Sequence, residues 1–257
     1  MQNKVLMILC DGMRPDAVDI CKHPFVSVLK NQAAYNPHAQ TVFPSFTLPC
    51  HMSLFHSVEP FEHGTLENVY TPYKDNGLFE QLRDNNKNTA MFYSWGELKD
   101  LYKPYSLCYG KFVSETYIDS YEMTEMLTND CENFIAEHKP DFAFLYLETT
   151  DGIGHEKGWG SDEYYKAAYH SFSMIEQIMS NLPKDYSVII LADHGGHDFT
   201  HGTDLPIDMT IPIFIKTDRK IDYERFEKAT ILDIAPTVCD IIGVDCSSVC
   251  KGKSLVK

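Results

Sequence analysis

The sequence predicts an α/β fold, a three-layer sandwich in which a central, mostly parallel β-sheet is covered by helices on both faces. Short apolar runs recur along the chain, each about as long as a central strand that is buried on both sides. Amphipathic helical patterns lie between these runs, and such alternation is typical of a parallel sheet wrapped by helices. The predicted strands are Val5–Cys10, Ala90–Tyr93, Phe142–Leu147, Ser187–Ala192 and Ile211–Ile215.

Three segments carry the clearest helical signals. Between Tyr165 and Met179, apolar residues recur at spacings of three and four, after an N-cap signal at Ser161. A second long helix is predicted between Ile118 and Ile135, and a third over Ile231–Ile242, where Gly243 ends the pattern. These helices are long enough to cover the faces of the predicted sheet.

Composition limits the class of protein. The 257 residues fit one domain of ordinary size, so we expect a single domain over residues 1–257. There are 22 Lys and Arg against 37 Asp and Glu, which gives a net charge of −15. This balance argues against a nucleic-acid backbone as the partner. An anionic substrate would need bound cations to reverse the local charge.

The sequence also suggests a location. No stretch approaches the ~18 apolar residues of a membrane span, so no membrane partner is expected. The apolar run Val5–Cys10 is too short for the core of a signal peptide. The eight cysteines include no Cys-x-x-Cys pair, which favours reduced thiols in a cytoplasmic protein. Nothing in the sequence indicates an oligomeric state.

Three predicted strands lead into aspartates. Asp11 and Asp193 directly follow their strands, and Asp151 comes shortly after Phe142–Leu147. A single aspartate in such a place usually caps the next turn. Because the carboxyl ends of parallel strands form the ligand edge of an open α/β sheet, three aspartates there predict a common site.

Histidines accompany these aspartates at spacings that favour metal binding. Asp151 and His155 are separated by Gly-Ile-Gly, where we expect a tight turn, and Asp193 is followed directly by His194. Carboxylate and imidazole ligands suit Zn²⁺, with Mn²⁺ or Fe²⁺ as alternatives. His197 could replace a ligand, line the substrate pocket or orient a ligand. The six candidate ligands, enough for two divalent cations, are Asp11, Asp151, His155, Asp193, His194 and His201.

A candidate nucleophile lies in the segment 41–51, which has the pattern of a loop entering a helix. Pro49 fits a first helical turn, so Thr47 would stand near the helix N-terminus, where free amides favour an anion. Taken alone, a threonine in such a position is most often a helix cap. The rival hydroxyls are Thr41, Ser45 and Ser53.

An ordered set of motifs resembles the alkaline phosphatase superfamily, and within it the nucleotide pyrophosphatase/phosphodiesterase type and phosphonoacetate hydrolase. The motifs are DGMRPD, TVFPSFTLPCHMSLFHSVEPFEHG, TTDGIGH, LADHGG and HGTD, followed near the C-terminus by TILDIAPTVCDIIG. The resemblance implies a largely parallel sheet between helices. It also implies a two-metal hydrolase of phosphate esters, acting on a small phosphodiester or nucleotide-like substrate.

The resemblance also implies roles for individual residues. Thr47 would be the nucleophile and form a covalent phospho-enzyme. One cation would be held by Asp151, His155 and His201, and the other by Asp11, Asp193 and His194.

Substrate recognition is less well defined by the resemblance. Cys50 stands where the family pattern has an asparagine that contacts phosphate, and Arg14 could touch a substrate anion or form an ion pair. A small substrate-specificity insert would fall around residues 73–140. The alternatives are a phosphomonoesterase, a phosphonate hydrolase, a metal-dependent phosphomutase, or a non-catalytic metal-stabilised binding module.

Overall fold

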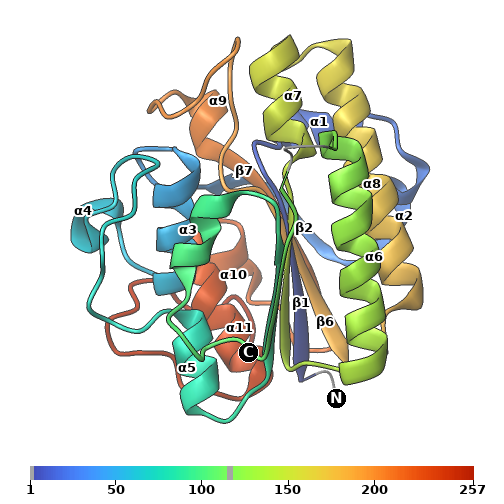
Figure 1. Ribbon diagram of the computed structural model, residues 1–257. Helices are drawn as coiled ribbons and strands as arrows, with labels where there is room; N and C mark the ends of the chain where they lie inside the picture. The colour runs from blue at the N-terminus through green and yellow to red at the C-terminus, as the bar shows by residue number, and fades with distance from the viewer. Residues whose placement is uncertain (1–2, 115–117) are drawn as a thin grey trace.

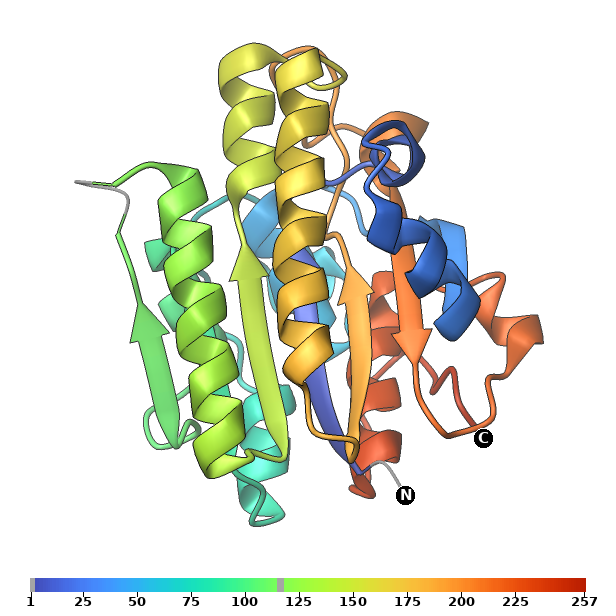
Figure 2. The ribbon, with the colours of Figure 1, turned by 90° about the vertical axis from the view of Figure 1, so that its right-hand side faces the viewer.

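The computed structural model describes residues 3–114 and 118–257, and in these ranges seven strands form one sheet in the order β2-β7-β6-β1-β5-β3-β4. Strand β7 runs antiparallel to its neighbours β6 and β2, whereas the other pairings are parallel. In Figure 2 the orange arrow of β7 points opposite to that of β6. All five predicted strands are confirmed. The strands are β1 (Lys4–Cys10), β2 (Ala34–Gln40), β3 (Thr89–Tyr93), β4 (Tyr109–Phe112), β5 (Phe142–Leu147), β6 (Tyr186–Leu191) and β7 (Thr210–Lys216).

The two strands that the sequence did not indicate lie at the edges of the sheet. Strand β2 contains Pro37, which has no N–H to donate, and its pairing with β7 shifts register between Asn36 and Ala39. Strand β4 has four residues that alternate between half-buried and exposed. Edge strands bury only part of their surface, so neither has the continuous apolar run of a central strand.

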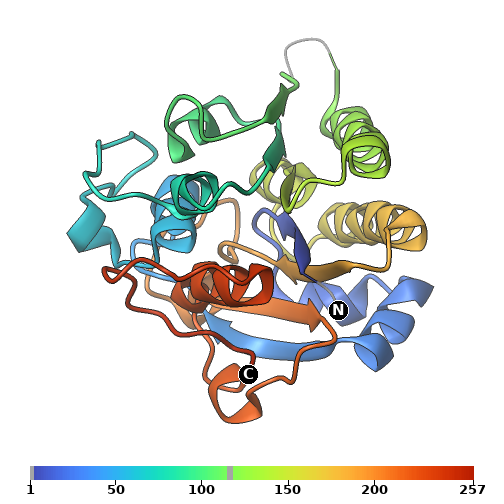
Figure 3. The same ribbon diagram turned by 90° about the horizontal axis from the view of Figure 1, so that it is seen from below.

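Helices cover both faces of the sheet (Figures 1 and 3). One face carries α3, α5 and α11, and the other carries α2, α6 and α8, so the predicted three-layer sandwich is confirmed. The helices are α1 (Pro15–Ile20), α2 (Pro24–Gln32), α3 (Thr47–His56), α4 (Pro60–His63), α5 (Leu78–Asp84), α6 (Ser120–His138), α7 (Thr149–Lys157), α8 (Asp162–Asn181), α9 (Pro206–Met209), α10 (Tyr223–Phe226) and α11 (Ile234–Ile242), with 3₁₀ turns η1 (Gly96–Leu101) and η2 (Ile231–Asp233).

The residues predicted to begin and end two of the helices do so in the structure. The Ser161 side chain accepts a hydrogen bond from the Tyr164 amide at 3.1 Å and caps α8. Gly243 adopts a φ of 80° directly after α11, a conformation that ends helices. The predicted helix over 231–242 is divided between η2 and α11.

The centre of the sheet fixes the place of the functional residues. Strand β1 is paired on both sides, with β5 and β6, and all three strands are almost wholly buried. The residues that follow these strands therefore meet at the carboxyl ends of the three central strands, near α7 and α9 at the top of Figure 1. Within the described ranges, no helix combines the length and the apolar character needed to cross a bilayer. A cytoplasmic location stays a prediction.

Candidate metal centre

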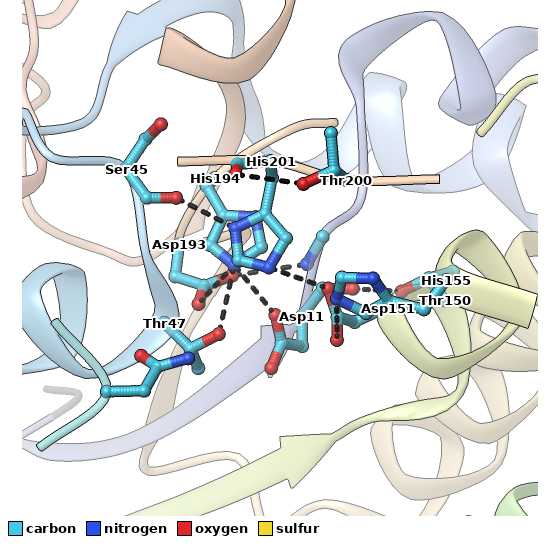
Figure 4. A network of polar contacts seen from close by, with 12 residues as sticks. Asp11, Ser45, Thr47, Thr150, Asp151, His155, Asp193, His194, Thr200 and His201 are labelled. Atoms are coloured by element: carbon cyan, nitrogen blue, oxygen red, sulfur yellow. Dashed lines mark hydrogen bonds and ion pairs between the residues drawn. The ribbon is translucent and has the colours of Figure 1, made fainter. Parts of the chain in front are cut away.

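The six predicted ligands lie together at this edge of the sheet, in two groups (Figure 4). They come from the turn after β1, the loop after β6 and helix α7 after β5. In each group, one potential ligand atom from every residue lies within 4.8 Å of those of the other two. The first group is Asp11, Asp193 and His194, and the second is Asp151, His155 and His201.

The geometry around Asp151 differs from the expected tight turn. Asp151 and His155 lie four residues apart on helix α7, so their side chains share one face and are 3.5 Å apart at Oδ2 and Nε2. The glycines between them do not bend the chain. Instead, a Cβ at Gly154 would lie 2.5 Å from the indole of Trp159, so this glycine makes room for that ring.

All three histidines present the same ring nitrogen to the site. In each case Nδ1 faces a backbone carbonyl, which can only accept, so Nδ1 carries a proton and Nε2 is the nitrogen that faces the site. This arrangement is typical of imidazoles that bind a metal through Nε2. The bonds run from His194 to Gly195 at 2.7 Å, from His155 to Phe199 at 3.0 Å and from His201 to Ser45 at 2.9 Å. Burial lowers the pKa of His194, but the charge of Asp193 and the contact with Asp11 outweigh it and raise that pKa to about 10, so a cation must displace a proton from its Nε2.

The three carboxylates have oxygens without partners. Asp11 Oδ1, Asp151 Oδ1 and Asp193 Oδ2 are buried and accept no hydrogen bond in the described structure. Such an oxygen is costly to bury unless a cation or a donor compensates it. These oxygens face imidazole nitrogens instead: Asp11 Oδ1 is 3.2 Å from His194 Nε2, and Asp151 Oδ1 is 3.7 Å from His201 Nε2. Such a set of carboxylate oxygens and Nε2 atoms fits two divalent cations that accept oxygen and imidazole ligands.

Electrostatics agrees with this assignment. Burial raises the pKa of Asp151 and of Asp193 well above the ordinary range, and the negative charge of Asp11 raises both further. Burial also raises the pKa of Asp11, but the hydrogen bond and charge of His194 outweigh it and bring that pKa to about 2. The cluster therefore resists holding three negative charges unless positive charge enters it.

Neighbouring groups orient two of the carboxylates. The Gly12 amide donates to Asp193 Oδ1 at 3.2 Å, and the Tyr146 hydroxyl donates to Asp11 Oδ2. Gly12 has a φ of 64°, and a Cβ there would lie 3.0 Å from Asp151 Oδ1. The glycine thus lets the backbone after β1 pass close to the second group.

Thr47 lies beside the first group. It is the first residue of α3, and its Oγ1 is 3.2 Å from Nε2 of His194. The rival hydroxyls are engaged elsewhere: Ser45 donates to the Thr203 carbonyl at 2.7 Å, and Ser53 pairs with His63 at 3.1 Å. A hydroxyl at a helix N-terminus next to candidate metal ligands is well placed to meet an anionic group.

Asn68 is a site residue that the sequence did not reveal. Its Oδ1 accepts a hydrogen bond from the Leu48 amide at 2.9 Å, in the first turn of α3. The carboxamide therefore lies next to Thr47, although Asn68 is 21 residues further along an irregular segment. No spacing rule connects these positions, so only the fold brings them together.

The three predicted substrate contacts have different surroundings. Cys50 is fully buried and accepts a hydrogen bond from the Thr41 hydroxyl at 3.2 Å. The guanidinium of Arg14 pairs with both carboxylate oxygens of Asp16, the alternative that the sequence left open.

His197 has a partner on the side of the loop that faces α9. Its Nδ1 donates to buried Asp208 at 2.8 Å and so ties the loop after β6 to α9. Substrate contact by Cys50, Arg14 or His197 stays a prediction.

Known proteins resemble this chain in sequence and in fold. The model of the family "Type I phosphodiesterase / nucleotide pyrophosphatase" matches residues 5–107 and 78–240. The chain belongs to this family. The human ectonucleotide pyrophosphatase/phosphodiesterase family member 1 is 27% identical over 194 residues, 67% of this chain and 21% of the human protein. The phosphopentomutase of Clostridioides difficile (strain 630) is 27% identical over 191 residues, 74% of this chain and 42% of the mutase.

A solved structure of the phosphodiesterase group has the same fold. An inactive variant of the murine ectonucleotide pyrophosphatase/phosphodiesterase 5 in complex with AMP superposes with a TM-score of 0.79. It is 12% identical, and the match covers 100% of both chains. The chain spans only about a fifth of the length of the human relative, so family membership here concerns the domain that both proteins share.

Proposed function

We propose that this chain hydrolyses phosphate esters with two divalent cations and with Thr47 as the nucleophile. The observation that carries the proposal is the place of the Thr47 hydroxyl, 3.2 Å from His194 Nε2 at the start of α3. Two groups of unpaired carboxylate oxygens and imidazole nitrogens lie around it. The family match supports the same chemistry.

The ligands of the two proposed cations follow from the two groups. Asp11, Asp193 and His194 would hold one, and Asp151, His155 and His201 the other. Zn²⁺ is the first expectation, with Mn²⁺ and Fe²⁺ as alternatives. When bound, such cations lower the pKa of a hydroxyl and stabilise charge on phosphoryl oxygens.

The chain's own residues account for the remaining steps. Thr47 Oγ1 gives up its proton to water and attacks phosphorus in line, while the bond to the departing alkoxide breaks and that alkoxide takes up a proton from water. A phosphothreonine-type ester remains, which keeps the second organic group of a diester substrate. Water then cleaves the bond between phosphorus and Thr47 Oγ1, which releases the phosphate product and restores the hydroxyl. The N-terminus of α3 attracts the anionic phosphoryl group, and the Asn68 amide lies beside it to donate to an oxygen.

We propose a nucleotide-like phosphodiester as the substrate class. The names of the human relative and the AMP complex of the murine structure support this choice. A cavity of about 430 Å³ opens between the start of α6 and helix α7, the helix that also carries Asp151 and His155. Its walls include Tyr121 at the start of α6, Glu148, and Ile153 on α7. Part of this wall belongs to the segment 73–140 that we propose as the substrate-specificity insert.

Turnover of model substrates tests the proposal. Bis-p-nitrophenyl phosphate should be cleaved faster than p-nitrophenyl phosphate with Zn²⁺ or Mn²⁺ present, and a chelator should abolish both reactions. Preference for the monoester would favour a phosphatase or a mutase, the activity named for the Clostridioides relative. If neither substrate nor a panel of phosphonates were cleaved while cations bound, the non-catalytic binding module would be favoured.

A pair of Thr47 variants tests the nucleophile. Thr47→Ala should bind both cations but lose at least about 10³-fold in kcat, because no hydroxyl remains to attack phosphorus. Thr47→Ser keeps the hydroxyl and should retain most of the rate. Full activity of Thr47→Ala in the same assay would show that another group is the nucleophile.

A further inference from the structure

Trp159 lies in the link between α7 and α8, with its ring in a slot between two glycines. A Cβ at Gly154 would lie 2.5 Å from the indole, and a Cβ at Gly196 would lie 2.3 Å from it. Both distances are far below van der Waals contact, so any larger residue would displace the ring. Only 7% of Trp159 is exposed, although it belongs to a link between helices.

The indole contacts three segments that carry candidate metal ligands. Its Nε1 donates to the carbonyl of Gly12, directly after Asp11, at 2.9 Å. The ring packs edge-on against His155 and His201, with centroid distances of 4.9 and 5.8 Å. The slot side formed by Gly196 belongs to the loop that begins with Asp193 and His194.

These contacts are unequal between the two groups. Two ligands of the second group, His155 and His201, touch the indole through their rings. The first group meets it only through the backbone of Gly12 and Gly196. Loss of the indole would free two imidazoles of the second group directly, whereas it would reach the side chains of the first group only through the stacking of His201 on His194, at a centroid distance of 3.8 Å.

We propose that Trp159 is a positioning residue that holds the Asp151–His155–His201 group ready for its cation. This inference rests on the proposed two-cation function. Removal of the indole should selectively lower the affinity of this group for its cation. Loss of a residue that orients metal ligands typically lowers metal affinity by about 10- to 100-fold.

Titration of the metal-free protein with Zn²⁺ by calorimetry tests the inference without measuring turnover. The wild type should bind two cations. Trp159→Leu should lower the affinity for one cation by about 10- to 100-fold and change the affinity for the other by no more than about threefold. Trp159→Phe keeps a ring in the slot but loses the N–H to Gly12, and should give a smaller effect. Trp95→Phe removes the other tryptophan and should change neither affinity.

The glycines of the slot provide an independent test. Gly196→Ala places a methyl group where the ring lies. It should therefore lower the affinity for the same cation, although all six candidate ligands are kept. In the double variant Gly196→Ala with Trp159→Leu, the two losses should be less than additive, because both changes act on one contact. Fully additive losses would contradict a shared mechanism.

The outcomes separate this inference from the proposed function. If the wild type binds two cations and Trp159→Leu binds both as tightly, or loses both equally, the positioning role is refuted and the proposed function stands. If the wild type binds no divalent cation, the proposed function is refuted and the inference with it. Circular dichroism of each variant confirms that the fold is retained.

Discussion

At the scale of single residues, Asp193 combines features that favour function over stability. It is fully buried, one of its oxygens accepts from the Gly12 amide, and the other has no hydrogen-bond donor. Burial and the charge of Asp11 raise its pKa, so its ionised form destabilises the metal-free fold. A residue with this cost is expected where a cation compensates it.

Asp193→Asn should therefore stabilise the metal-free protein. The amide keeps an oxygen for the Gly12 N–H and removes a buried charge, which should raise Tm in chelator by at least about 2–4 °C, equivalent to ~1 kcal/mol. The same variant should lose the stabilisation by Zn²⁺ and the turnover. Thermal unfolding with and without the cation checks this, and a lower Tm than wild type in chelator would contradict it.

At the scale of elements, the loop between β6 and α9 is held by close backbone contact. A Cβ at Gly195 would lie 2.0 Å from the Ile207 carbonyl oxygen, whereas a Cβ at Gly152 on α7 would meet nothing within 4 Å. The two glycines therefore differ in purpose. Gly195 lets the ligand-bearing loop lie against α9, and Gly152 only lowers the helix propensity of α7.

Alanine at these two positions should have opposite effects. Gly195→Ala should lower Tm by several degrees and weaken cation binding, because the loop must move away from α9. Gly152→Ala should raise the free energy of unfolding by about 0.5–1 kcal/mol, the usual gain inside a helix. Denaturant unfolding of both variants tests this, and a stabilised Gly195→Ala would show that the loop yields freely.

Helices α3 and α4 carry two buried histidines away from the metal ligands. Burial lowers the pKa of His56 and of His63 to about 4, and the charge of Lys103 adds to the effect on His56. An unfolded histidine titrates near 6.5. Between pH 6.5 and 4 the unfolded state takes up protons that the folded state refuses, so stability falls as the pH falls through this window.

His56→Phe should flatten this pH dependence. Phenylalanine keeps a ring opposite Tyr73, which packs against His56 at a centroid distance of 5.2 Å, and it cannot take up a proton. The decrease of Tm from pH 6.5 to pH 4 should be smaller in the variant than in the wild type. An unchanged slope would mean that other groups control stability in this window.

At the scale of the whole molecule, the net charge of −15 and the carboxylate cluster both favour the binding of cations. A ligand that binds only the folded state at 100 times its Kd contributes about 2.7 kcal/mol per site. Chelation should therefore lower Tm by roughly 5–10 °C per cation lost. Differential scanning calorimetry measures this shift, and Mg²⁺ at the same ionic strength serves as a control for screening.

The sequence predicted the parts of the molecule that depend on local pattern. The five buried strands are continuous apolar runs, and Asp11 and Asp193 follow two of them directly, so the sheet edge that gathers the ligands was predictable. Strand β2 lacks such a run, and the helical course of α7 was hidden by its glycines. Asn68 and Trp159 reach the site through tertiary packing, which no spacing along the chain encodes.

The ligands of the two groups are spread from Asp11 to His201, a separation of 190 residues (201 − 11). During synthesis, neither group can be complete until β6 and the loop after it have left the ribosome and β1 has paired between β5 and β6. A nascent chain that ends before the loop after β6 lacks Asp193, His194 and His201, and therefore two ligands of the first group and one of the second. Capture of the proposed cations would thus be a late event, which follows the pairing of β1 with β5 and β6 and couples metal binding to folding.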